Sequence, residues 1–175
     1  RELTFRDAGA GFGKKVDIDQ YDTDGYPCKQ LIVWDPINKE IIGGYRFNIF
    51  NDLKHKKLKD IPLLNKSLYD VSNNFISDYI PYLVELSRAF IQPMYQPKNV
   101  GKKAAFSLDN IWDGLGALVV KYPFLKYYFG RLTFFSNYNT TVRDSIFYFF
   151  DKHLKGDVFL LKAKELVFII ILYSY

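Results

Sequence analysis

The sequence has very few residues that bind metals or form disulfides. It contains one cysteine, Cys28, and two histidines, His55 and His153. A single cysteine excludes an intramolecular disulfide and a zinc site built from several cysteines. Two histidines this far apart in the chain do not have the spacing of metal ligands. We therefore expect no bound metal, and a reducing compartment, the cytoplasm, as the location.

Long hydrophobic runs are also missing. The most apolar stretch, residues 166–173, is much shorter than the roughly 20 residues that a membrane-spanning helix needs. We expect a buried β-strand there instead. The lack of a long apolar or amphipathic segment speaks against a protein that acts by inserting into membranes. The sequence begins at Arg1 without a signal peptide, so we expect a trimmed chain.

Aromatic and basic residues are, by contrast, abundant. Phe, Tyr and Trp make up 18% of the sequence, enough to fill a large core or to line a tunnel for an acyl chain. The net charge is +5, and basic residues gather in residues 54–59 and 98–103. These runs are either solvated loops or a docking surface for an anionic partner: a phosphate-bearing cofactor, an acidic carrier protein or acidic lipid headgroups. No motif indicates nucleic-acid binding.

The length and patterning predict one mixed α/β domain over residues 1–175. A hairpin is expected over residues 29–50, where Gly43 and Gly44 indicate a bulge or a close approach of two backbones. Helices and strands then alternate. They are a helix capped by Ser72, a strand over residues 82–91, a helix over 104–120, a strand over 126–135, a helix over 140–154 capped by Thr140 or Thr141, and a strand over 166–173.

The strand over residues 82–91 carries an unusual pair of charges, Glu85 and Arg88, inside an apolar run. Burying an ionised carboxylate without a partner is costly, so the two charges either pair with each other or line a site. Residues three apart in a regular strand point to opposite faces. We therefore predict a β-bulge between them, which re-aims the side chains and frees backbone N–H groups for an oxyanion. The charges are tolerable if this strand opens onto a cleft.

Four segments, in order, resemble one family of enzymes: "LIVWDPINKEIIGGYRF", "DYIPYLVELSRAFIQPMYQ", "LDNIWDGLGALVVKYP" and "FGRLTFFSNYN". The run "ELSRAFI" followed by a basic loop and a helix resembles the fourth strand and motif A of the GNAT acyltransferase superfamily. Glu85-x-x-Arg88, Gly44-x-Arg46 and "DIDQYDTD" resemble the acyl-homoserine-lactone synthases and the related, often hemolysin-like, ornithine- and glycine-lipid synthases. The resemblance covers residues 3–154 and is nearest to the lipoamino-acid branch.

This resemblance implies a GNAT-like fold, in which a central, mostly antiparallel sheet splays into a V and is flanked by helices. It implies N-acyl transfer from an acyl thioester, commonly on acyl carrier protein, to the α-amine of an amino acid, with no tightly bound cofactor. It also implies that a C-terminal portion is missing or misplaced, because residues 156–175 match no part of the family. The product would serve lipoamino-acid synthesis.

Two features depart from the family pattern. Coenzyme-A-dependent relatives have a compact glycine-rich loop that binds the pyrophosphate, whereas "YQPKNVGKKAA" is longer and has one glycine. This favours acyl carrier protein over coenzyme A as the donor, with docking at Lys98, Gly101, Lys102 and Lys103. A tyrosine expected seven residues after a post-strand asparagine is also absent, since Ile146 stands there if Asn139 is that asparagine.

Acyl transfer to an amine needs a neutral amine, a stabilised oxyanion and a proton for the departing thiolate. Glu85 is the predicted base; a structural ion pair or a backbone hydrogen bond is the alternative. Arg46 and the catalytic candidate Arg88 would bind the carboxylate of the acceptor, or pair with Asp22, Asp24 or Asp113. Tyr138 is the candidate acid for the thiolate. The other predicted substrate-binding residues are Trp34, Ser87, Trp112 and Asn139.

Two other interpretations stay open at this point. The first is a hemolysin-like protein without turnover that binds acyl carrier protein or a membrane. The second is a coenzyme-A-dependent N-acetyltransferase. The expected partners are acyl carrier protein and an amino-acid acceptor. The expected location is the cytoplasm, and a peripheral contact with the inner face of the membrane is compatible with it.

Overall fold

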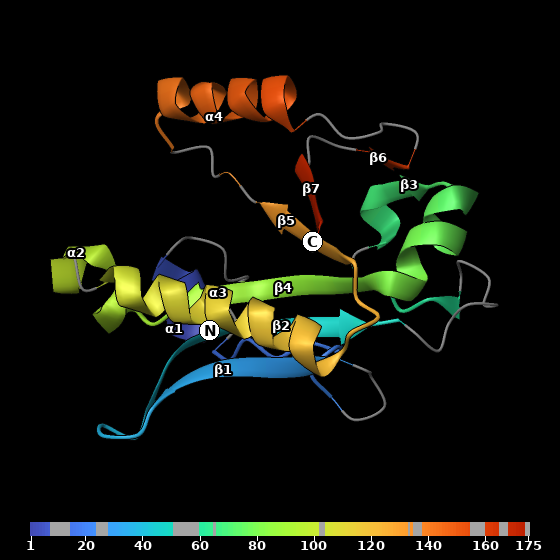
Figure 1. Ribbon diagram of the computed structural model, residues 1–175. Helices are drawn as coiled ribbons and strands as arrows, with labels where there is room; N and C mark the ends of the chain where they lie inside the picture. Colours follow the sequence, from blue (N-terminus) through green and yellow to red (C-terminus); the bar gives the residue numbers. More distant parts are fainter. Residues whose placement is uncertain are drawn as a thin grey trace.

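A five-stranded sheet forms the body of the protein (Figure 1). The computed structural model describes residues 1–7, 15–23, 28–50, 60–64, 66–101, 104–132, 134, 138–154, 160–164 and 168–173. The strand order is β1-β2-β4-β5-β7, and only β4 and β5 pair in parallel. A mixed α/β fold with a mostly antiparallel sheet and flanking helices is therefore confirmed.

The predicted hairpin is formed by β1 (Lys29–Asp35) and β2 (Glu40–Ile49). Its turn is held by Asp35, whose Oδ1 accepts hydrogen bonds from the backbone N–H groups of Ile37 and Asn38. The two backbones approach closely at Gly44, as predicted: a Cβ there would lie 2.2 Å from the carbonyl oxygen of Leu31. Only glycine fits this position without moving a strand.

One face of the sheet is covered by α3 (Ala104–Lys121), close to the predicted bounds. Its apolar stripe contacts inward-facing side chains of β2 and β4. The Tyr128 hydroxyl also donates a hydrogen bond to the carbonyl of Leu115, at 2.6 Å. The buried residues of this layer are Tyr45, Phe47, Val84, Ile111, Leu115, Leu118 and Leu125.

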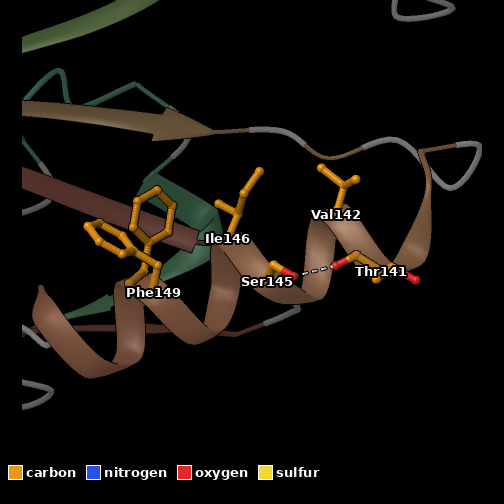
Figure 2. Close-up of a pocket in the computed structure, with 6 residues that line it drawn as sticks. Thr141, Val142, Ser145, Ile146 and Phe149 are labelled. Carbon is orange, nitrogen blue, oxygen red and sulfur yellow. Dashed lines mark hydrogen bonds between the residues drawn. The ribbon is translucent and has the colours of Figure 1, made fainter.

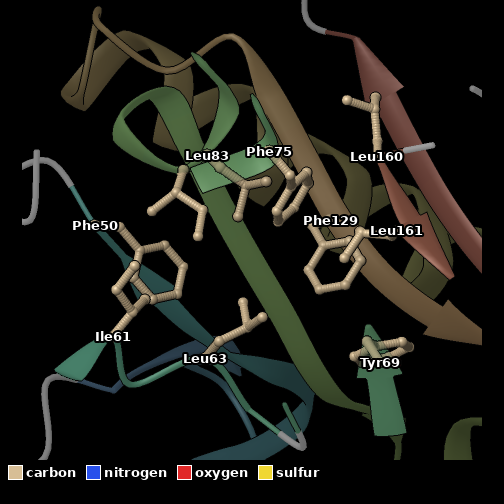
Figure 3. Close-up of a cluster of buried hydrophobic side chains, with 10 residues drawn as sticks. Phe50, Ile61, Leu63, Tyr69, Phe75, Leu83, Phe129, Leu160 and Leu161 are labelled. Atoms are coloured by element: carbon tan, nitrogen blue, oxygen red, sulfur yellow. The ribbon is translucent and has the colours of Figure 1, made fainter. Parts of the chain in front are cut away.

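A second apolar core lies on the opposite face (Figure 3). It is built by Leu83 of β4 (Leu83–Ile91), Phe129 of β5 (Tyr127–Leu132) and side chains from connecting segments. Among these are the helical turns η4 (Phe75–Tyr79) and η5 (Ile80–Tyr82). The predicted Ser72 cap is present, because Ser72 Oγ accepts a hydrogen bond from the Phe75 N–H at 3.0 Å.

Several short elements were not predicted, because three to six residues are too few to show a period. A second sheet pairs β3 (Tyr69–Val71) with β6 (Leu161–Ala163). The other short helices are α1 (Glu2–Asp7), η3 (Lys66–Leu68), η6 (Pro93–Tyr95) and α2 (Pro97–Val100).

The C-terminal part contains α4 (Thr140–His153) and the edge strand β7 (Phe168–Tyr173), which pairs with β5. The prediction of Thr140 or Thr141 as the cap of α4 was wrong. Asn139 caps the helix, because its side chain accepts a hydrogen bond from the Val142 N–H at 3.2 Å. In the described residues, no helix is long and apolar enough to cross a membrane.

Candidate active site between strands β4 and β5

The parallel pairing of β4 and β5 ends at Glu85. Three residue pairs join the strands, and the last is Glu85 with Phe129. Beyond this point β4 continues to Ile91 beside β2, while β5 continues to Leu132 beside β7. Figure 1 shows β5 and β7 running at an angle to β4. The predicted V-shaped splay is therefore present, and it opens immediately after Glu85.

Glu85 lies at the border between an apolar and a charged half of one sheet face. Alternation along the strands and the pairing of Glu85 with Asn48 and Phe129 place these three side chains on that face. On the β5 side the neighbours belong to the apolar core of Figure 3. On the β2 side they are polar, with Arg46 opposite Ser87. The apolar and the charged surfaces therefore meet at Glu85.

The carboxyl group of Glu85 is buried, with 3% of the residue exposed. The Leu64 N–H donates a hydrogen bond to Glu85 Oε2 at 2.9 Å, and Asn48 Nδ2 donates to the carbonyl of Pro62 at 3.1 Å. The buried segment of residues 61–64 is thereby tied down over Glu85 and Asn48. Glu85 therefore does not face an open cleft, because this segment covers its carboxyl group.

Burial raises the pKa of Glu85 to about 8, although the Leu64 N–H and the positive charges of Arg46 and Arg131 oppose the shift. Desolvation outweighs these favourable contacts because the carboxylate has lost nearly all of its water. A carboxyl group with this pKa can both take up and release a proton near neutral pH. This is the property that a general base requires.

A β-bulge at Arg88 resolves the problem of the two charges three residues apart. Gly44 pairs with Phe90 and Arg46 with Ser87, so one residue of β2 faces two residues of β4. Arg88 has a φ of 53°, a conformation rare outside glycine. The extra residue turns the Arg88 side chain toward Asp17 and Asp19, on the side of Arg46 and Glu85. The predicted bulge is therefore present, at Arg88 itself.

Arg46 and Arg88 are both occupied by aspartates of the chain. Arg46 is buried and contacts Asp19 at 2.6 Å and Asp22 at 3.1 Å, while its Nε donates to Ser87 Oγ. Arg88 contacts Asp17 at 3.2 Å and Asp19 at 3.5 Å.

Arg1 completes this charged cluster of three arginines and three aspartates. It contacts Asp17 and Asp22, each at 2.8 Å. Its hydrogen bonds hold the pKa of Asp22 well below the usual range. Of the alternative ion-pair partners that the sequence suggested, Asp22 is used by Arg46, Asp113 lies on α3, and Asp24 lies outside the described residues.

The other predicted site residues lie away from Glu85. Trp34 on β1 and Trp112 on α3 are about half exposed, at 50% and 54%. Asn139 caps α4, and the Tyr138 ring meets that of Phe134 edge-on, with 6.2 Å between centroids. Tyr138 and Asn139 therefore belong to the α4 end of the molecule. Their predicted roles in catalysis and substrate binding stay predictions.

The predicted donor-docking segment links β4 to α3 through two short helical turns, η6 and α2. Lys98 is exposed on α2, and Gly101 ends that helix with a φ of 55° and a ψ of −131°, a combination that favours glycine. The segment is longer than a compact phosphate loop. Lys102, Lys103 and the basic residues 54–59 lie outside the described residues.

Sequence reasoning missed Tyr69 and Arg131, which lie beside Glu85. Arg131 follows Phe129 by two residues on β5, and its guanidinium lies near the buried hydroxyl of Tyr69. A signal was available, because Arg131 is a charged residue inside the apolar run "KYYFGRLTFF". The same signal identified Glu85 on β4.

A separate cavity of about 480 Å³ runs along α4 (Figure 2). The described residues that line it are mostly apolar, and none of them has a titratable side chain. The Ser145 hydroxyl donates a hydrogen bond to the carbonyl of Thr141 within the helix. This groove offers contact surface but no acid or base. The residues that line it are Thr141, Val142, Ser145, Ile146, Phe149 and Phe150.

Comparison with known proteins gives two results. Residues 1–104 match the family described as the acetyltransferase (GNAT) domain. A glycine N(alpha)-acyltransferase of Phocaeicola vulgatus is 45% identical over 157 residues, and one of Bacteroides thetaiotaomicron is 45% identical over 153 residues. These alignments cover 90% and 87% of this chain but only 48% and 45% of the relatives, so the chain spans about half their length. No solved structure matches.

Proposed function

Because the chain belongs to the GNAT acetyltransferase family, we propose that it transfers an acyl group from a thioester to the α-amine of an amino acid. Glycine is the proposed acceptor, in line with the names of the two relatives. The observation that carries the proposal is the carboxyl group of Glu85, buried at the point where β4 leaves β5 and poised to titrate near pH 8.

The proposed reaction uses Glu85 as the base. An ammonium group cannot attack a thioester, so the Glu85 carboxylate removes one proton from the amine. The amine nitrogen then attacks the thioester carbonyl, and a tetrahedral oxyanion forms. Backbone N–H groups on the edge of β4 that β5 has left are suited to hold this oxyanion. The C–S bond then breaks while the new C–N bond persists. The nitrogen loses its second proton, the departing thiolate takes up one proton to leave as a thiol, and the first proton stays on Glu85 until it passes to water.

Direct transfer is favoured over a covalent acyl-enzyme. Cys28 is the only cysteine, and burial raises the pKa of its thiol to about 11. At neutral pH the thiol stays protonated and is a poor nucleophile. The acyl group therefore passes from donor to amine in one displacement within the splay.

The proposed donor is an acyl carrier protein carrying a long acyl chain, and the product an N-acyl amino acid for lipid synthesis. Two short helical turns stand where a compact pyrophosphate-binding loop would lie. The adjacent segment is basic, with Lys98 exposed on α2 and Lys102 and Lys103 following in the sequence. An acidic carrier suits such a surface, because opposite charges speed its encounter with the enzyme.

The test is an assay that follows thiol release and product together. The protein is incubated with palmitoyl thioesters of acyl carrier protein and of coenzyme A, and with single amino acids. Thiol release with N-palmitoylglycine as the product, identified by mass spectrometry, is the expected result. Binding of the acyl carrier thioester without thiol release for any amino acid would support a non-catalytic carrier-binding protein instead.

A further inference from the structure

Among the described residues, one arginine beside the splay has no carboxylate partner. Arg1, Arg46 and Arg88 are matched by Asp17, Asp19 and Asp22 in the charged cluster. Within the described residues, Arg131 has no carboxylate at ion-pair distance, and its side chain is exposed. In the part of the chain that the structure describes, Arg131 is therefore better placed than Arg46 or Arg88 to receive an anionic ligand.

The position of Arg131 follows from the strand register. Phe129 is the last residue of β5 to pair with β4, and its partner is Glu85. Arg131 comes two residues later, so its side chain leaves the same face of the sheet, just where the strands have separated. Arg131 and Glu85 therefore flank the opening from opposite strands.

A buried tyrosine lies beside the guanidinium. The Tyr69 ring meets Phe129 edge-on, with 6.0 Å between centroids, and Tyr69 is only 5% exposed. Burial raises the pKa of the Tyr69 hydroxyl, and the nearby positive charge of Arg131 opposes that shift. A long side chain packed beside a buried polar group loses less freedom when it binds a ligand.

We propose that Arg131 binds the α-carboxylate of the acceptor amino acid and thereby selects α-amino acids over other amines. This inference rests on the proposed function and names the acceptor contact within it. The guanidinium fork binds a carboxylate through two parallel hydrogen bonds, which fixes the direction of the rest of the molecule. The amine of the bound amino acid then points across the opening toward Glu85.

The span between the two side chains suits an α-amino acid. Two residues along a strand cover about 6.6 Å and neighbouring strands lie about 4.8 Å apart, so the two backbone positions are roughly 8 Å apart before the strands diverge. Both side chains leave the same face of the sheet, Glu85 beneath residues 61–64 and Arg131 toward solvent. In an α-amino acid the amine and the carboxylate are attached to the same carbon. We expect such a compact molecule to contact Glu85 with its amine and Arg131 with its carboxylate.

The experiment compares glycine with glycinamide, which keeps the amine but lacks the negative charge. Palmitoyl acyl carrier protein serves as the donor, and product is measured by mass spectrometry. For the unaltered protein, kcat/KM is expected to be much higher for glycine. In Arg131→Gln the KM for glycine should rise about tenfold to a hundredfold, and the preference over glycinamide should largely disappear. The KM for the donor should stay unchanged.

Three further variants complete the test. Arg131→Lys keeps the positive charge but loses the two parallel donors of the guanidinium. Its preference for glycine over glycinamide should lie between those of the unaltered protein and Arg131→Gln. Tyr69→Phe should raise the KM for glycine several-fold, because the guanidinium loses the polar group that lies beside it. Arg143→Gln is the matched control, since Arg143 lies on α4 and pairs with Asp144. It should behave like the unaltered protein.

The outcomes separate this inference from the proposed function. Lack of any N-acylglycine from the unaltered protein would overturn the function and, with it, this inference. An active protein in which Arg131→Gln leaves the preference for glycine over glycinamide intact would overturn the inference alone. An equal rise in the KM for the donor would also overturn it, because Arg131 would then serve the thioester.

Discussion

Replacing Glu85 with glutamine should affect activity and stability in opposite directions. Glutamine fills nearly the same volume and can still accept the hydrogen bond from the Leu64 N–H. It cannot take a proton from the amine, so turnover should fall by about 100-fold or more. A residue with a purely structural role would not combine this loss with a gain in stability.

The gain in stability follows from the raised pKa of Glu85, about 8 in the folded protein against an ordinary value of 4.5. Below about pH 4.5 the carboxyl group is protonated in both the folded and unfolded states. Between 4.5 and 8 only the folded state keeps the proton, so the free energy of unfolding falls as the pH rises. At about 1.4 kcal/mol per pH unit, the full loss is about 4–5 kcal/mol.

Glu85→Gln removes this loss, because an amide does not ionise. Denaturant unfolding should therefore be measured at about pH 5 and about pH 9. The free energy of unfolding of the variant, relative to that of the unaltered protein, should increase by several kcal/mol between these two pH values. Over the same range, kcat of the unaltered protein should rise through about pH 8 as Glu85 loses its proton, and this rise should be absent from the variant.

Glu40→Gln is the matched control, since Glu40 is exposed at the start of β2. It should change neither the pH dependence of stability nor that of turnover. Two results would refute the reasoning. Normal turnover of Glu85→Gln at every pH would exclude the base, and a pH-independent difference in stability would exclude the raised pKa.

Three other predictions concern packing, ion pairs and docking. Gly44→Ala should destabilise the protein by about 2 kcal/mol or more, because the new Cβ would meet a backbone carbonyl of β1; Gly116→Ala, in open space on α3, should stabilise it by about 0.5–1 kcal/mol in the same thermal unfolding assay. Asp22→Asn should lower stability at about pH 7 more than at about pH 3, since the depressed pKa of Asp22 stabilises the fold above its ordinary pKa and that stabilisation is lost as the pH falls. Reversing Lys102 and Lys103 to Glu should raise the KM for the acyl carrier thioester several-fold and flatten its salt dependence, with the KM for glycine unchanged; unchanged kinetics would place the docking surface elsewhere.

The longer elements could be predicted from the sequence because their periodicity is strong. The hairpin, β4, α3 and α4 all lie close to the predicted ranges. Gly43 and Gly44 predicted the close approach of β1 to β2, and the charges within β4 predicted the splay and the bulge. In each case a residue type that fits badly into a regular strand marked an irregularity.

The contacts between distant segments could not be predicted in the same way. The sequence offered several aspartates as partners for Arg46 and Arg88, and spacing alone did not choose among them. The cover over Glu85 by residues 61–64 depends on two hydrogen bonds to a loop without a repeating pattern. Arg131 became a candidate only when the register of β5 placed it two residues beyond Phe129, the partner of Glu85, on the same face.

The charged cluster also constrains the order in which this protein can fold during synthesis. Asp19 and Arg88 are 69 residues apart in the chain. At 5–20 residues per second, roughly 3–14 s separate the synthesis of the two. Until β4 has been made, the aspartates have Arg1 and Arg46 as partners but lack Arg88. The cluster is therefore complete only after the strand that carries Glu85 has been synthesised, and its contacts are among the non-local ones that form slowly.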